Sequence, residues 1–178
     1  MNKLFKNKYR IKSIRLKDWD YSSNGYYYIT ICTKNRKCVL GNVVNGKMGL
    51  SQIGEIVQHC WHDLPNHYPN CNLDVLIIMP NHVHGIVIID NENVKSNVEA
   101  GFKPASTNMK QHGLFEIIRA FKTFSSRKIN GMQNLFHFNW QRDYYEHIIR
   151  DEHELNRIRE YITNNPLQWE LDRNNLNA

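Results

Sequence analysis

Two histidines separated by one residue, His82 and His84, are the side chains whose spacing most directly suggests chemistry in this chain. They begin the run His82-Val-His-Gly-Ile-Val-Ile88, whose β-branched residues are typical of a strand. Side chains alternate between the faces of a strand, so both imidazoles should point to one side and Val83 to the core. Two imidazoles held in this way can share a divalent metal ion. Such a pair is also common in packing and hydrogen bonding, so the metal hypothesis needs a further ligand.

Tyr161 and Asn165, four positions apart near the end of the chain, could complete such a site. Both would lie on one face of an expected helix, which must cross the strand of the histidines for the four side chains to meet. A carboxamide oxygen is a suitable third ligand for a divalent ion, and a tyrosine hydroxyl can attack phosphorus. The ion would stabilise the charge that develops at the phosphate. The alternative is that Tyr161 packs at the helix edge and Asn165 caps the helix.

The charge balance favours a polyanionic partner, with nucleic acid first. The chain has 23 Lys and Arg against 17 Asp and Glu, a formal net charge of +6. Basic residues gather in the first 20 positions and on an expected helix at 114–129. We expect phosphate contacts from Arg15, Arg119, Lys122, Arg127, Lys128 and Arg142. The alternative is a solvated basic surface.

Composition also bears on the compartment. No apolar run is long enough to span a bilayer, and no apolar segment follows the basic N-terminus, so we expect neither membrane association nor a signal peptide. The four cysteines form no C-x-x-C pair, which predicts free thiols in a cytoplasmic protein. They are Cys32, Cys38, Cys60 and Cys71.

Periodicity and turn residues predict five strands, at 26–33, 38–44, 47–50, 73–79 and 82–88. Asn45-Gly46 is a strong hairpin turn between the second and third strands, and Pro80-Asn81 should turn the fourth into the fifth. The aromatic segment 136–150 is expected to be partly extended. Residues 90–113 lack periodicity and are predicted to form a flexible loop.

Helices are predicted between these strands. Ser51 caps the first, which Pro65 should end, and Asp151 with Glu154 begins the last, which ends before Pro166. The helix at 114–129 has an apolar stripe of Leu114, Ile117, Ile118, Phe121 and Phe124. We interpret residues 1–178 as a single domain with a basic N-terminal arm at 1–20.

Several motifs in one order resemble a known family. The segments Met79-Pro-Asn-His-Val-His-Gly-Ile86 and Arg159-Glu-Tyr-Ile-Thr-Asn-Asn-Pro166 resemble the HUH superfamily of single-tyrosine, insertion-sequence-200-like transposases, and in particular its branch associated with repetitive extragenic palindromes (REP). Further matches cover nearly the whole chain, at 15–22, 27–33, 119–123 and 140–150. Each motif is weak alone, and their combination is specific.

The resemblance implies an α+β fold, in which a central antiparallel sheet of ferredoxin-like or RNA-recognition-motif-like kind has helices packed on one face. It implies metal binding by His82, His84 and Asn165, with Mg²⁺ or Mn²⁺ as the ion. It implies that Tyr161 cleaves single-stranded DNA flanking a hairpin, remains linked to the 5′-phosphate and leaves a 3′-hydroxyl for later strand transfer. A bacterial, nucleoid-associated location follows, while monomer and homodimer remain open.

Alternatives remain at both the residue and the function level. Tyr144 and Tyr145 are other nucleophiles by chemistry alone, and Asn164 competes with the shorter-than-usual ligand Asn165. The chain could instead be a hairpin-DNA-binding protein that has lost cleavage, whose DNA affinity would not respond to a chelator. A third hypothesis is an RNA-processing nuclease, which should act equally on an all-RNA hairpin.

Overall fold

The computed structural model describes residues 15–92, 111–132, 137–172 and 174–175. Its centre is a four-stranded sheet of β1 (Gly25–Cys32), β4 (Cys71–Met79), β5 (His82–Ile89) and β6 (Tyr145–Ile149). The strand order is β4-β5-β1-β6, and each neighbouring pair is antiparallel. In chain order, the four strands form a β-α-β-β-α-β unit of the ferredoxin-like kind, with one helical connection between β1 and β4 and another between β5 and β6. The predicted fold class is therefore confirmed.

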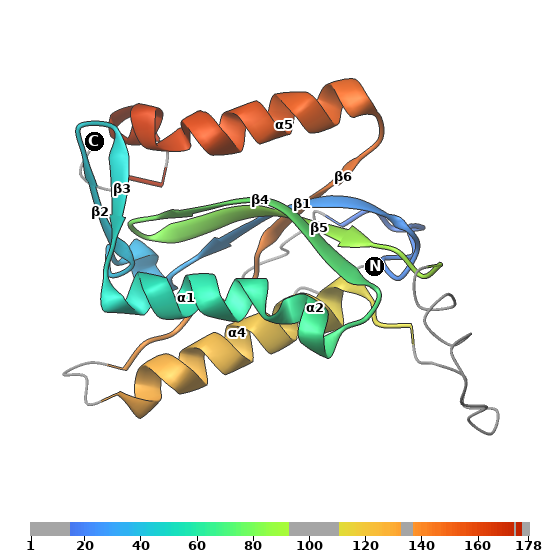
Figure 1. The fold of residues 1–178 in the computed structure, drawn as a ribbon, viewed down its shortest axis with the longest axis horizontal. Helices are drawn as coiled ribbons and strands as arrows, with labels where there is room; N and C mark the ends of the chain where they lie inside the picture. The colour runs from blue at the N-terminus through green and yellow to red at the C-terminus, as the bar shows by residue number, and fades with distance from the viewer. Residues whose placement is uncertain (1–14, 93–110, 133–136, 173, 176–178) are drawn as a thin grey trace, which may run out of the picture.

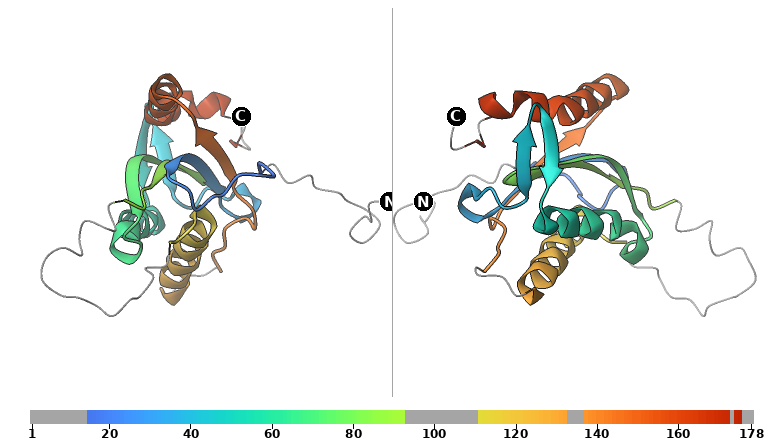
Figure 2. Two further views of the ribbon diagram at one scale, coloured as in Figure 1. Left: turned by 90° about the vertical axis from the view of Figure 1, so that its right-hand side faces the viewer. Right: turned by 60° about the vertical axis from the view of Figure 1, so that its left-hand side comes forward.

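Helices cover both faces of this sheet, one face more than the resemblance implied. The helices α1 (Gln52–His62), α2 (Leu64–His67) and α4 (Leu114–Gly131) lie on one side, and α5 (Glu152–Asn164) lies on the other (Figures 1 and 2). The strands supply both cores by alternation. Tyr27, Ile29 and Ile31 of β1 join the core on the α1 and α4 side, while Ile86 of β5 packs with α5.

Local signals explain where several elements begin and turn. Ser51 Oγ accepts a hydrogen bond from the Gly54 backbone N–H at 3.1 Å and caps α1. Asp151 accepts from Glu154 N–H at 2.7 Å and caps α5. The hairpin of β2 (Gly41–Val44) and β3 (Lys47–Leu50) turns at Asn45 and Gly46, both with positive φ. These caps and turns are those that the sequence predicts.

Two helix predictions are wrong in detail. The apolar stripe predicted for α4 includes Phe124, but this residue is 44% exposed, and its ring stacks on His67 of α2 at 5.8 Å. Ser125 is buried instead, because its hydroxyl bonds to Phe121 O at 2.7 Å and receives the Trp140 indole N–H at 2.9 Å. Pro65 does not end α1; it lies in the first turn of the separate helix α2.

The last structured segment follows α5 directly. A 3₁₀ helix, η2 (Asn165–Leu171), turns the chain back toward the sheet, and the β2–β3 hairpin lies beside it (Figure 2). A short 3₁₀ turn, η1 (Lys34–Arg36), follows β1. Most of the predicted loop, at 93–110, and most of the basic arm, at 1–14, lie outside the described residues. Within the described ranges, no helix combines the length and apolar character needed to cross a membrane.

Candidate metal centre and tyrosine site

His82 and His84 point to the same face of β5, the face toward α5, as their spacing predicts. Both are fully buried, at 0% and 1% exposure. Their Nε2 atoms lie 2.9 Å apart, and their rings are nearly perpendicular, at 73°. Val83 between them is buried in the opposite core, also as predicted. The strand thus brings two imidazole nitrogens to one point inside the protein.

The other nitrogen of each ring, Nδ1, contacts a polar side chain. His82 Nδ1 lies 2.8 Å from Asn81 Oδ1. The Asn81 amide donates to the carbonyls of Arg36 and Asn174, so its oxygen is the acceptor and His82 Nδ1 carries the proton. A neutral His82 therefore presents the lone pair of Nε2 toward His84. Groups that fix a ring in this way also orient histidine ligands of metals.

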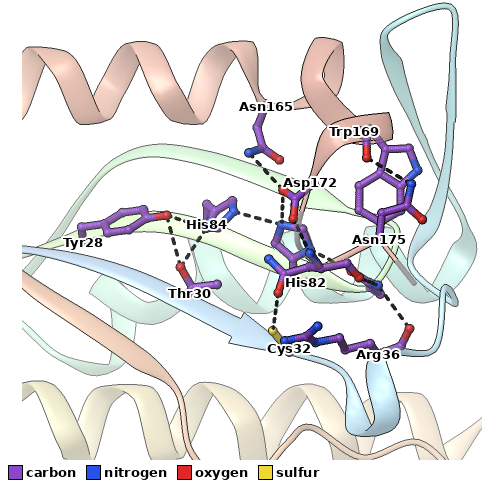
Figure 3. Close-up of polar contacts among 12 residues, drawn as sticks. Tyr28, Thr30, Cys32, Arg36, His82, His84, Asn165, Trp169, Asp172 and Asn175 are labelled. Carbon is purple, nitrogen blue, oxygen red and sulfur yellow. Dashed lines mark hydrogen bonds and ion pairs between the residues drawn. The ribbon is translucent and has the colours of Figure 1, made fainter. Parts of the chain in front are cut away.

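His84 has a different outer contact. Its Nδ1 lies 2.8 Å from the Tyr28 hydroxyl and 2.9 Å from the Thr30 hydroxyl, both on β1 (Figure 3). Hydroxyls can donate or accept, so His84 can take either tautomer. With Nδ1 protonated, both Nε2 lone pairs face the same space and could bind one ion.

Asp172, which the sequence analysis missed, lies beside this pair. Its Oδ2 is 3.8 Å from His82 Nε2, and its Oδ1 accepts from the Asn174 backbone N–H at 2.6 Å. The candidate ligand atoms of His82, His84 and Asp172 lie within 4.8 Å of one another. No spacing motif connects position 172 to the histidines, because only the turn of η2 brings this carboxylate back over β5.

Asn165, the predicted third ligand, also reaches this region. It is 2% exposed and projects from the end of α5 toward Asp172 and His82 (Figure 3). Its Nδ2 lies 3.5 Å from Asp172 Oδ2, and its Oδ1 is buried without a hydrogen-bond partner among the described residues. An unsatisfied buried oxygen is costly unless a ligand binds it. Two imidazoles, a carboxylate and this amide oxygen form a donor set that suits a divalent ion.

Tyr161 lies next to the histidines at the protein surface. Its ring centre is 5.4 Å from that of His84 and 6.3 Å from that of Tyr28, and its side chain is 43% exposed. The two other tyrosines considered as nucleophiles lie differently. Tyr145 faces the α5 side beside Tyr28, whereas Tyr144 packs against Phe115 of α4 on the other face of the sheet.

Tyr144 is poorly suited to act as a nucleophile. Burial raises the pKa of its phenol, and nearby Glu146 raises it further. Its hydroxyl is buried and lacks a hydrogen-bond partner within the described part of the chain. It lies across the sheet from His82 and His84, so those imidazoles could not assist it.

The predicted DNA-contacting residues gather mainly at one pocket on the α4 side. This pocket, of about 850 Å³, lies between α4 and the segment 137–144. Five of the six predicted cations line it, namely Arg15, Arg119, Lys122, Arg127 and Arg142. Lys128 does not line this pocket. Burial raises the pKa of the Cys60 thiol on α1, and the positive charge of Lys128 opposes that shift.

Two of these cations already have partners in the protein. Lys122 Nζ donates to the carbonyls of Gln141 and Arg142 at 2.7 and 2.8 Å, and burial lowers its pKa. Arg15 lies 3.4 Å from Glu146 and over the ring of Phe115 at 4.1 Å. Lys122 therefore holds the loop that carries Arg142.

Comparison with known proteins first defines the class of fold. The chain superposes with a TM-score of 0.59 on a REP-associated tyrosine transposase bound to a REP hairpin, at 17% identity over 90% of this chain and 77% of that one. It also aligns with a transposase candidate from Deinococcus radiodurans R1, at a TM-score of 0.47 and 19% identity over 84% of this chain and 95% of the other. The first similarity shows that this chain and that tyrosine transposase share a fold.

Sequence comparison then gives the family. The chain is 42% identical over 165 residues to an uncharacterized protein of Haemophilus influenzae. The alignment covers 90% of this chain and 91% of that protein. The chain belongs to the same family as that protein. No family model matches it.

Proposed function

We propose that the chain is a metal-dependent, single-stranded DNA transposase that cleaves and rejoins hairpin-flanked DNA through Tyr161. The observation that carries this proposal is the position of Tyr161, whose exposed ring lies 5.4 Å from the ring of buried His84. A nucleophile accessible to a large substrate thus adjoins a cluster of metal-binding groups. The motif resemblance and the shared fold with a tyrosine transposase support the same conclusion.

His82, His84, Asp172 and Asn165 would hold the ion. The two Nε2 atoms lie 2.9 Å apart, and the Asn165 oxygen lacks a hydrogen-bond partner among the described residues, so a cation would give that oxygen a partner. The carboxylate and amide oxygens of this set suit Mg²⁺ or Mn²⁺, the ions that the motif resemblance implies. When bound, such an ion supplies charge stabilisation at a phosphate oxygen.

The reaction would proceed at Tyr161 in two steps, strand cleavage and strand joining. The phenol oxygen attacks phosphorus and its proton leaves to solvent, which reaches this exposed side chain. The bond from phosphorus to the 3′ oxygen breaks, and that oxygen takes up a proton to become a free 3′-hydroxyl. The reverse attack by the 3′-hydroxyl of another strand joins the strands and regenerates Tyr161.

The DNA partner would lie against the basic pocket on the α4 side. Five cations line that pocket, and they can contact a phosphate backbone. The solved transposase with this fold is bound to a REP hairpin, which supports hairpin DNA as the substrate class. The hairpin and the reacting phosphate would then occupy opposite faces of the sheet.

A covalent-trapping assay tests the proposal. Labelled hairpin oligonucleotides with unpaired flanks are incubated with protein and Mn²⁺ or Mg²⁺, and a denaturation-resistant adduct is sought. We expect an adduct in the wild type and in the matched control Tyr145→Phe, and none in Tyr161→Phe or with a chelator. An all-RNA hairpin should give no adduct.

Other outcomes point to the alternatives. An adduct that survives Tyr161→Phe would move the nucleophile to another tyrosine. Oligonucleotide binding without any adduct, unchanged by chelator, would overturn the enzyme proposal in favour of a hairpin-binding protein. Equal reaction on RNA would favour the RNA-processing nuclease.

A further inference from the structure

A small groove opens beside Tyr161 on the α5 side of the sheet. Its volume is about 320 Å³, at the lower end of the range for ligand pockets. This space is too small for a duplex and suits one flat group. It is lined by Tyr28, Tyr145, His147, Glu154, Arg157, Ile158 and Tyr161.

Three tyrosines give the groove aromatic walls. Tyr145 and Tyr161 are 40% and 43% exposed, so both rings are accessible to a ligand from solvent. Tyr28 lies between them, 6.1 Å from the ring of Tyr145 and 6.3 Å from that of Tyr161, edge-on to both. Exposed aromatic rings that line one groove provide faces on which an unpaired base can stack.

The polar rim of the groove carries one carboxylate, and that carboxylate is paired. Glu154 is the carboxylate in the lining, and both of its oxygens have partners. Oε1 lies 2.7 Å from His147 Nε2, and Oε2 accepts the Arg150 backbone N–H at 3.0 Å. Arg157 lies 3.7 Å from the same carboxylate with 70% of its side chain exposed. Arg157 therefore pairs with the negative charge of Glu154 at the solvent-exposed rim of the groove.

We propose that this groove binds the unpaired nucleobase next to the phosphate that Tyr161 attacks, by stacking on Tyr145. The inference rests on the proposed function and names a substrate contact within it. The ring of Tyr161 is itself one wall of the groove, so a base seated there belongs to a nucleotide adjacent to the reacting phosphate. A paired base has both faces covered by its neighbours in the duplex, which restricts the occupant to single-stranded DNA.

Fluorescence of 2-aminopurine tests this contact without any need for cleavage. Hairpin oligonucleotides carry the probe at one position after another in the unpaired flank, and they are bound to Tyr161→Phe protein, which keeps the ring but lacks the nucleophile. Stacking quenches the probe, so we expect strong quenching at one flank position. The Tyr145→Ala change on that background should abolish it and weaken binding about 5- to 150-fold. Tyr145→Phe should preserve both.

Tyr26→Ala is the matched control, because Tyr26 is 38% exposed on the same face of the sheet but does not line the groove. It should leave the quenching unchanged. The proposal is overturned if no flank position is quenched, or if quenching persists in Tyr145→Ala. If either result occurs while the wild type still forms an adduct at Tyr161, the base site is rejected and the transposase reaction is retained. Quenching that depends on Tyr145 without any adduct in the wild type would reject the transposase reaction alone.

Discussion

The indole of Trp61 occupies the space in which a side chain at position 85 would lie. A Cβ atom built on Gly85 would be 2.5 Å from Trp61 Cζ2 and 3.1 Å from Cε2. Gly85 directly follows His84, so this contact packs β5, the strand of the two histidines, closely against α1. Trp61 is fully buried and also meets Phe121 edge-on at 5.1 Å, which leaves its indole little room to move.

Gly85→Ala should therefore destabilise the protein by about 1–3 kcal/mol, because an added methyl overpacks a rigid contact. Urea unfolding monitored by tryptophan fluorescence measures the change. Gly49→Ala is the control, since Gly49 also lies in a strand and a Cβ there has its nearest contact at 3.8 Å. Equal losses in the two variants would contradict a specific role for Trp61.

Metal binding should stabilise the folded protein through His84. Mn²⁺ at about 100 times its dissociation constant should add about 2.7 kcal/mol to the free energy of unfolding, if the ion binds only the folded chain. His84→Ala should abolish that gain, whereas His62→Ala, at an exposed position on α1, should retain it. Thermal unfolding with and without Mn²⁺ gives the comparison. A full gain in His84→Ala would place the ion elsewhere.

Asp172 should contribute to the same affinity. Asp172→Asn keeps the size of the side chain but removes its charge, so we expect Mn²⁺ affinity to fall about tenfold or more. Isothermal titration measures it. Glu170→Gln makes the same chemical change at an exposed position of η2, the 3₁₀ helix that directly precedes Asp172, and should leave the affinity unaltered. Similar losses in both variants would indicate a general charge effect.

The pocket on the α4 side predicts a difference between two adjacent cations. Arg127 lines the pocket and Lys128 does not, although both are exposed on α4. Arg127→Ala should weaken hairpin-DNA binding and reduce the slope of log affinity against log salt by about 1. Lys128→Ala should have a smaller effect on both. Fluorescence anisotropy at several salt concentrations tests this, and equal effects would count against the pocket.

Glu146 provides a test of pH dependence. Burial raises the pKa of its carboxyl, against the opposing effect of Arg15. A group with a raised folded-state pKa contributes stability that is fully present below its unfolded pKa and is lost as the pH rises through the folded value. Glu146→Gln should therefore raise the unfolding midpoint at neutral pH, with the gain disappearing near pH 4, about the unfolded pKa of glutamate. A gain of equal size at both pH values would refute this.

The sequence by itself determined the features that depend on neighbours along the chain. Alternation along β5 placed His82 and His84 on one face and Val83 on the other, because strand side chains repeat every two residues. The caps at Ser51 and Asp151 and the turn at Asn45-Gly46 follow from hydrogen bonds and backbone angles within a few residues.

Only the tertiary structure decided which distant groups meet. Asp172 reaches His82 because η2 reverses the chain after α5, and no spacing in the sequence encodes that return. Phe124 is exposed and stacks on His67 of α2, while Ser125 takes the buried position and receives the Trp140 indole N–H. Lys122, for which the sequence predicts a phosphate contact, also donates to two backbone carbonyls that are distant in the sequence. Such contacts depend on how whole elements pack, and packing is settled by shape and burial over the entire chain.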